Sequence, residues 1–180
     1  AFVGSVRCVY ETGFMVGIEK LLTKHKHVHV IHATGNHDIR TAGHLRETFA
    51  MLYRNEPRVT VDTSPMDYYA YEWGRVSLFY HHGHKRNMSN VDRAFLGIFR
   101  KMWGRTDYSF AALGHRHNEA SFSTETMLVK QYRTIAAPDA HSASCGYNSG
   151  RSATIPTYSK KYGLYGTVEV PEGILIGASA

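Results

Sequence analysis

Histidine and asparagine side chains stand in three short, glycine-containing turns of this chain. The turns are Gly35-Asn36-His37-Asp38, His82-Gly83-His84 and Gly114-His115-Arg116-His117. Imidazole is the commonest protein ligand for metal ions, and an amide oxygen adds a harder donor. Together these side chains suit Zn, Mn, Fe or Ni better than Ca or Mg alone. We therefore interpret the three turns as the ligand-bearing parts of one metal site.

The number of turns matters more than any one histidine. A single histidine at a strand end is more often a surface or hydrogen-bonded residue than a ligand, and an H-x-H pair is a weak signal by itself. Three such turns in order, each after an apolar run, favour the metal site over chance. The glycines at 35, 83 and 114 allow close approach of the backbone or a positive φ in each turn.

The elements that must position these turns follow from the spacing of the apolar residues. Apolar residues recur at helical intervals over 14–26, 41–54 and 90–103. Runs rich in β-branched and aromatic residues predict strands at 28–31, 59–62, 68–73, 76–80, 109–113, 126–130, 132–136 and 164–170. Residues 138–161 are predicted as loop. In α/β sheets, ligands gather at the carboxyl ends of strands, so we expect the turns to converge there.

The helix predicted over 41–54 has a definite orientation. We expect Thr41 to cap its start and the apolar Phe49 and Leu52 to face inward, with Arg46 and Glu47 facing outward. Likewise, Asn90 is expected to cap a single helix that continues to Trp103.

Composition limits the class of protein. The chain has 180 residues, and we expect one domain over 1–170 with a tail over 171–180. No apolar run approaches the roughly 20 residues needed to span a bilayer, so no membrane partner is expected. Two cysteines form no disulfide framework, which favours a cytoplasmic location. The formal net charge of +6 favours an anionic partner, such as nucleic acid or a phosphorylated substrate.

The three turns resemble the later motifs of the calcineurin-like metallophosphoesterases, which read GNH[DE], an HG-containing strand end and GHxH. This resemblance extends over most of the chain and implies a sandwich of mixed β-sheets flanked by helices, an α/β fold. It also implies two divalent metal ions, with Mn as the first choice and Zn, Fe, Ni or Mg as alternatives. Asn36, His82 and His115 would then hold one metal, and His117 would hold the other.

The resemblance also implies roles in catalysis. His37 would contact the phosphate and protonate the leaving oxygen, while Asp38 would orient His37. Residues of neighbouring polar segments are weaker candidates for contact with substrate: His84, Arg86, His141 and Arg151.

One part of the family pattern is missing. The family begins with a D-x-H turn and a G-D-x-x-D turn, whose first aspartate bridges the metals. No Gly-Asp dipeptide occurs here, and the D-x-H at Asp139-Ala140-His141 lies after the last motif. We expect the missing strands and aspartates to precede Ala1, so that this chain alone binds metal weakly and has little activity.

The sequence therefore favours a metal-dependent phosphoester hydrolase. The basic charge favours nucleic acid or nucleotides as substrates, and parts of the chain resemble bacteriophage phosphoesterases (phosphodiesterases or nucleases) and, more distantly, DNA-repair exonucleases of the same superfamily. The other substrates considered are a small phosphomonoester, a cyclic nucleotide and a phosphoprotein. The alternative is a non-catalytic nucleic-acid-binding or interaction module on a degenerate phosphoesterase fold. The missing aspartates are what that alternative predicts.

Overall fold

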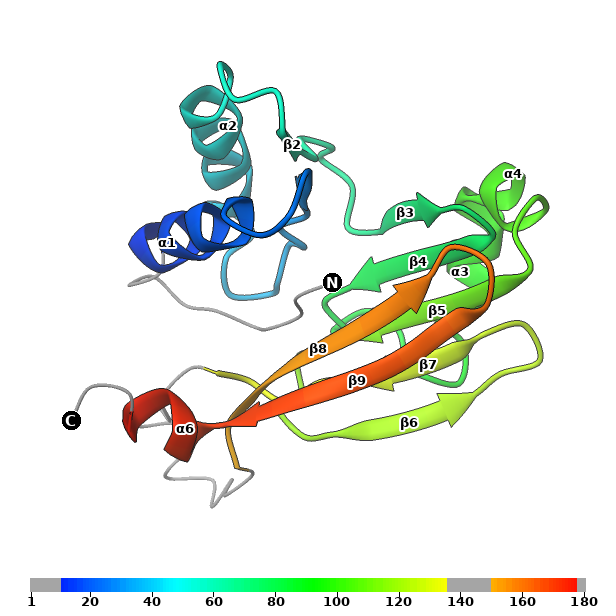
Figure 1. Cartoon of the computed structure of the whole chain (residues 1–180). Helices are drawn as coiled ribbons and strands as arrows, with labels where there is room; N and C mark the ends of the chain where they lie inside the picture. The colour runs from blue at the N-terminus through cyan, green and yellow to red at the C-terminus, as the bar shows by residue number, and fades with distance from the viewer. Residues whose placement is uncertain (1–10, 136–149, 178–180) are drawn as a thin grey trace. The chain divides into compact units, whose positions relative to one another are not determined.

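The computed structural model describes residues 11–135 and 150–177 (Figure 1). The chain divides into two compact units. We call Arg7–Tyr69 the N-terminal unit, and the larger one, which contains Ala70–Ala180, the sheet unit. Within the described ranges, no helix is long and apolar enough to cross a membrane.

The N-terminal unit is built on a β–α–β segment. Its elements in chain order are α1 (Glu11–Leu22), β1 (Val28–Val30), α2 (Ala42–Leu52) and β2 (Val59–Val61). The two strands pair in parallel, with Val28 opposite Val59. Both valines are buried against Ile18 of α1, because the helix turns its apolar residues toward the strands.

The sheet unit contains a mixed sheet and a separate two-stranded ribbon. Its elements are β3 (Tyr69–Trp73), β4 (Val76–His81), α3 (Val91–Ile98), α4 (Arg100–Trp103), β5 (Tyr108–Leu113), β6 (Ala120–Ser123), β7 (Leu128–Gln131), β8 (Ser152–Ser159), β9 (Gly163–Pro171) and α6 (Glu172–Gly177). Among the described strands, the sheet order is β3-β4-β5-β7-β6. β4, β5 and β7 run parallel, and β6 is antiparallel to β7.

The two faces of this sheet are covered by different elements (Figure 1). On one face, Phe79 of β4 stacks on Phe95 of α3, with ring centroids 5.0 Å apart. On the other face, Phe110 of β5 packs against Tyr158 of β8, also at 5.0 Å. β4 is consequently buried along almost its whole length, which explains its nearly continuous apolar sequence.

The structure confirms the α/β class and the mixed sheet flanked by helices. It also confirms strands at the positions that precede the histidine turns, in β4 and β5. The strands predicted at 68–73 and 76–80 are present as β3 and β4, which are neighbours joined by a tight turn in which Gly74 has φ 62°.

Several element predictions were wrong. The single helix over 90–103 is two helices, because Phe99 leaves the helical conformation with φ −109° and ψ 31°. The described part of 132–136 forms no strand; the partner of β7 is β6, which lies earlier in the chain. All of β8 lies in the stretch predicted as loop, because its Ser, Thr and Pro residues weaken the strand signal, and it pairs along its length with β9.

Candidate functional site

Two of the three histidine turns leave the same edge of the sheet. β4 and β5 are adjacent and parallel, and His81 at the end of β4 lies opposite Leu113 at the end of β5. The turns that follow therefore begin side by side. The Gly114 N–H donates to the His82 carbonyl at 3.0 Å, and Arg116 donates to the Asn87 side-chain oxygen at 3.2 Å.

The imidazole rings of these two turns form a cluster. The His82 and His115 ring centroids are 5.1 Å apart, and the His82 and His84 centroids are 5.4 Å apart. The His84 ring is 6.2 Å from that of His115. His82, His84 and His115 are half-buried. The predicted convergence of the second and third turns is thus present in the structure.

The backbone of these turns is constrained. Gly83 has φ 104°, and a Cβ atom there would lie 3.1 Å from the Gly114 carbonyl oxygen, so glycine is required on two counts. His115 and His117 have φ of 70° and 56°, in the left-handed region that non-glycine residues rarely adopt. Such strained residues concentrate at functional sites.

His81 is a buried residue that contacts the histidine cluster. Its side chain is buried, and its Nδ1 accepts the Gly83 N–H at 2.9 Å. A ring nitrogen that accepts a hydrogen bond carries no proton, so the neutral His81 ring has its proton on Nε2. The His81 ring also lies parallel to that of His84, with centroids 5.5 Å apart and planes inclined by 13°. His81 therefore fixes both the glycine turn and the orientation of His84.

The spacing of His82 and His115 fits a shared metal ion. Two imidazoles bound to one tetrahedral metal at about 2.0–2.1 Å have ring centroids roughly 5 Å apart. The observed 5.1 Å matches this value. Among the described residues, however, no three His, Cys, Asp or Glu side chains are grouped closely enough to hold a metal ion. The described residues of the sheet unit thus offer a pair of close imidazole side chains, His82 and His115.

The first turn lies in the N-terminal unit. Asn36 and His37 are exposed there, while Asp38 is half-buried. The Asp38 carboxylate accepts the Gly35 N–H at 2.6 Å and lies 3.1 Å from His32 Nε2. The Asp38 carbonyl also accepts the N–H groups of Thr41 and Ala42, which starts α2. Asp38 thus shapes its own loop and pairs with His32; the orienting of His37 by Asp38 stays a prediction.

A buried arginine holds this loop in the N-terminal unit. Arg46 of α2 is only 5% exposed, and its Nη1 donates to the His32 carbonyl, the Thr34 hydroxyl and the Tyr69 hydroxyl, at 3.2, 2.8 and 2.8 Å. The expectation that Arg46 faces outward was wrong. Leu52, expected inside, is 48% exposed. The acceptors from the loop and from Tyr69 all receive hydrogen bonds from Nη1, which offsets part of the cost of burying a charged side chain. Nε of Arg46 is buried with no hydrogen-bond partner among the described residues.

The weaker substrate candidates are dispersed. His84 lies in the histidine cluster, and Arg86 is exposed two residues further along. Arg151 lies before β8 and forms an ion pair with Glu172 of α6. His141 lies outside the described residues. In the sheet unit the structure therefore brings together His82, His84 and His115, with His117 in the same turn, and leaves Arg151 engaged with another element.

Three structural residues were missed by sequence reasoning: His32, Arg46 and His81. His32 stands six residues before Asp38, and neither the helical nor the strand repeat predicts a contact between residues in this loop. Arg46 is spaced three residues before Phe49, on the same helix face, and that spacing was an available signal. His81 ends a strand that is apolar along most of its length, which indicates burial.

Comparisons with known proteins give structural likenesses only. No protein-family model matches the chain, and no curated protein matches it. A conserved Streptococcus pneumoniae protein, described as a predicted phosphoesterase, is 14% identical with a TM-score of 0.45, over 95% of this chain and 96% of that one. Vps29 of Entamoeba histolytica complexed with zinc is 14% identical with a TM-score of 0.39, over 94% and 91%. A single mutant of that Vps29 is 15% identical with a TM-score of 0.43, over 87% and 88%. Sequence identities and TM-scores this low support no conclusion about function, which therefore rests on the residues of this chain.

Proposed function

We propose that this protein is a divalent-metal-dependent phosphoester hydrolase in which His82 and His115 are metal ligands. One observation carries the proposal: His82 and His115 follow two neighbouring parallel strands, and their ring centroids lie 5.1 Å apart. Ligand side chains on rigid strand ends meet the need for fixed coordination geometry. The left-handed backbone at His115 and His117 supports the same assignment.

The metal would polarise the phosphoryl group and supply a hydroxide nucleophile at neutral pH. Two metal ions are proposed, with Mn as the first choice and His117 and Asn36 as further donors. The chain's own residues have separate tasks. His37, exposed on its loop, would donate a proton to the leaving oxygen, and His84 and Arg86 would contact the phosphate. The basic net charge of +6 favours nucleotides or nucleic acid as substrate.

Hydrolysis of bis-p-nitrophenyl phosphate with Mn²⁺ tests this proposal. We expect slow hydrolysis that a chelator abolishes. His82→Ala and His115→Ala should each lower the rate by at least about 10- to 100-fold, the loss that follows even from removing an outer-shell partner of a ligand. His44→Ala is the matched control, because His44 is an exposed histidine of α2 and should leave the rate unchanged.

The leaving group tests the role of His37. p-Nitrophenolate departs without help from an acid, whereas an alkoxide requires protonation. His37→Ala should therefore lose more activity on a dinucleotide than on the p-nitrophenyl ester, with Mn²⁺ binding retained. Equal losses on both substrates would remove His37 from the proton-donor role. Metal-independent hydrolysis, or none in the wild type, would contradict the enzyme proposal itself.

A further inference from the structure

Three connections of the sheet unit meet at the end of the sheet opposite the histidine cluster. The Arg75 N–H, in the β3–β4 turn, donates to the Lys160 carbonyl in the β8–β9 turn at 2.8 Å. The Tyr108 N–H, at the start of β5, donates to the Arg75 carbonyl at 3.1 Å. Gly163 is packed so closely on the Tyr108 ring that a Cβ atom would lie 3.1 Å from it. These contacts make the three connections one continuous surface.

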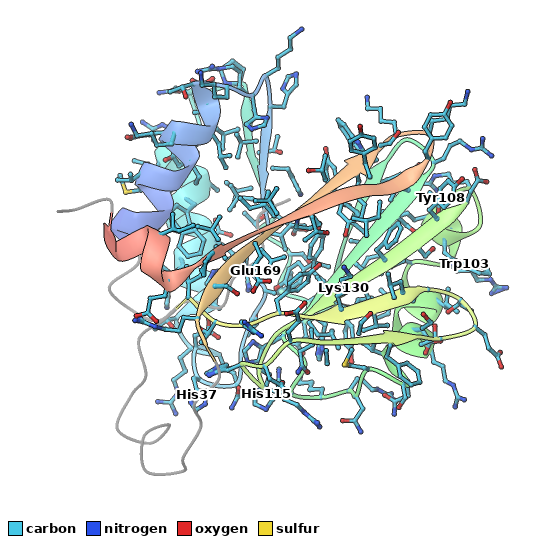
Figure 2. All side chains as sticks on the ribbon, turned by 60° about the horizontal axis from the view of Figure 1, so that its bottom comes forward. His37, Trp103, Tyr108, His115, Lys130 and Glu169 are labelled. Atoms are coloured by element: carbon cyan, nitrogen blue, oxygen red, sulfur yellow. The ribbon has the colours of Figure 1, made fainter. Side chains whose placement is uncertain are left out.

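Large aromatic side chains are exposed on this surface, which we call the aromatic end. They are Trp73, Trp103, Tyr108, Tyr162 and Tyr165, with exposed fractions of 36%, 37%, 38%, 68% and 83%. Figure 2 shows Trp103 and Tyr108 at this end and His115 at the other end of β5. The six residues of β5 separate the two ends by roughly 17 Å. The aromatic end is therefore a surface distinct from the histidine cluster.

The most exposed of these rings is displayed by a β-bulge. In the β8–β9 ribbon, Tyr158 pairs with Leu164 and Thr157 pairs with Gly166, so Tyr165 is an extra residue of β9 with no opposite residue in the ladder. A bulge of this kind re-aims a side chain and ends regular pairing. A tyrosine that is 83% exposed contributes little to core packing. The bulge therefore leaves an aromatic ring exposed to solvent.

The charge around the rings is positive. Residues 72–75, 100–107 and 158–165 carry six cationic side chains and two anionic ones. Both acids are neutralised, Glu72 by Arg105 and Asp107 by Arg75. Lys160 Nζ lies 4.3 Å from the centre of the Trp73 ring, and Lys161 Nζ lies 5.2 Å from that of Tyr162. The lysines are thus held beside exposed rings and are not neutralised by the two acids of these segments.

We propose that the aromatic end binds single-stranded nucleic acid. Surfaces that bind single strands combine cations along the phosphate backbone with aromatic rings on which successive bases stack. Here Tyr162 and Tyr165 would receive bases, and Lys160 and Lys161 would contact phosphates. A duplex hides its base faces and offers nothing to stack on these rings. The proposal does not depend on metal binding or on hydrolysis at the histidine cluster.

Fluorescence anisotropy with a fluorescein-labelled oligo-dT 12-mer at low salt tests the proposal. Tyr162→Ala and Tyr165→Ala should each weaken binding about 5- to 100-fold, since stacking on one ring is worth roughly that factor. Tyr165→Phe keeps the ring and should bind like the wild type. Phe122→Ala is the matched control, because Phe122 is 44% exposed on β6 of the same unit and should bind normally.

Salt dependence separates stacking from charge. Lys160→Gln and Lys161→Gln should each reduce the slope of log K against log salt by about 0.7, the value for one lost contact with a single strand. The tyrosine variants should leave that slope unchanged. Equal affinity for a 12-bp duplex, no binding by the wild type, or undiminished binding by both tyrosine-to-alanine variants would each overturn the proposal. So would self-association of the wild type, without oligonucleotide binding, that Tyr165→Ala abolishes, because this would assign the surface to a second copy of the chain.

Discussion

At the scale of single residues, the histidine turns combine close packing with backbone strain. Left-handed conformations at non-glycine residues cost on the order of 1–3 kcal/mol each. His115 and His117 both adopt them within one four-residue turn. Glycine at either position would remove that cost. The backbone strain is therefore a consequence of having histidine side chains at these two positions. His81 then holds the adjoining turn through its bond to the Gly83 N–H.

Arg46 gives a prediction about the first turn. Arg46→Met removes the buried donor shared by the His32 carbonyl, the Thr34 hydroxyl and the Tyr69 hydroxyl. Three acceptors lose a charged donor, so we expect the free energy of unfolding to fall by about 1–3 kcal/mol. Urea denaturation followed by circular dichroism measures this change, and amide hydrogen exchange over residues 32–38 should accelerate.

The exposed Arg40 provides the control for this prediction. Arg40→Met removes the same charge and adds the same side chain outside the interior, and it should change stability by less than about 0.5 kcal/mol. If Arg46→Met proved as harmless as Arg40→Met, the anchoring role of Arg46 would be wrong.

Sequence patterns predicted part of this residue-scale picture. Apolar strands that end in glycine-histidine turns correctly located His82, His84 and His115 at one sheet edge, because the ends of parallel strands must coincide. The inward position of Arg46 could not follow from polarity, since its burial depends on acceptors contributed by residues up to 23 positions away. Pairing of His32 with Asp38 likewise depends on a loop conformation that periodicity does not encode.

At the scale of elements, a tyrosine cluster joins the sheet to the β8–β9 ribbon. Burial raises the pKa of Tyr80 on β4 and of Tyr158 on β8, and it raises the pKa of Tyr132, which follows β7, to about 12. The Tyr132 and Tyr158 hydroxyls are also hydrogen-bonded to each other. In the unfolded chain these groups ionise near pH 10. Their folded pKa values are higher, so their contribution to stability is complete below pH 10 and is lost as the pH rises toward about 12.

This linkage predicts a steep alkaline loss of stability. The urea midpoint should fall between pH 10 and pH 12, and Tyr158→Phe should reduce that fall because one buried ionisable group is gone. Tyr162→Phe removes an exposed hydroxyl and should leave the pH dependence as in the wild type. An identical pH dependence in all three proteins would show that the cluster does not couple ribbon docking to ionisation.

Strand prediction failed where tertiary pairing decides the conformation. β6 (ASFS) and β8 (SATIPTYS) contain serine, alanine and proline, which weaken the sequence signal. β8 is a strand because eight residues of β9 pair with it, and β6 is a strand because it pairs with the open edge of β7. β4 and β5, by contrast, are apolar on both faces and were recognised from composition alone.

At the scale of the whole molecule, the sheet unit separates two surfaces. The aromatic end, formed by the starts of β4 and β5 together with the β8–β9 turn, carries exposed aromatic rings and lysines, while the ends of β4 and β5 carry the histidine turns (Figure 2). The N-terminal unit supplies the remaining sequence-predicted residues, Asn36, His37 and Asp38. The formal net charge of the entire chain is +6, which favours binding to polyanions. The proposed binding at one surface and the proposed hydrolysis at the other can therefore be tested by separate substitutions.

The central claim is that His82 and His115 bind one metal ion. NMR spectra of the full chain with ¹⁵N-labelled histidine side chains, titrated with substoichiometric Mn²⁺, test it most directly, because the paramagnetic ion broadens the nearest rings first. We predict early broadening of the His82 and His115 signals, with the exposed His44 unaffected, and loss of this pattern in His115→Ala. Broadening of His44 at the same Mn²⁺ concentration as His82 and His115 would contradict the metal-ligand assignment.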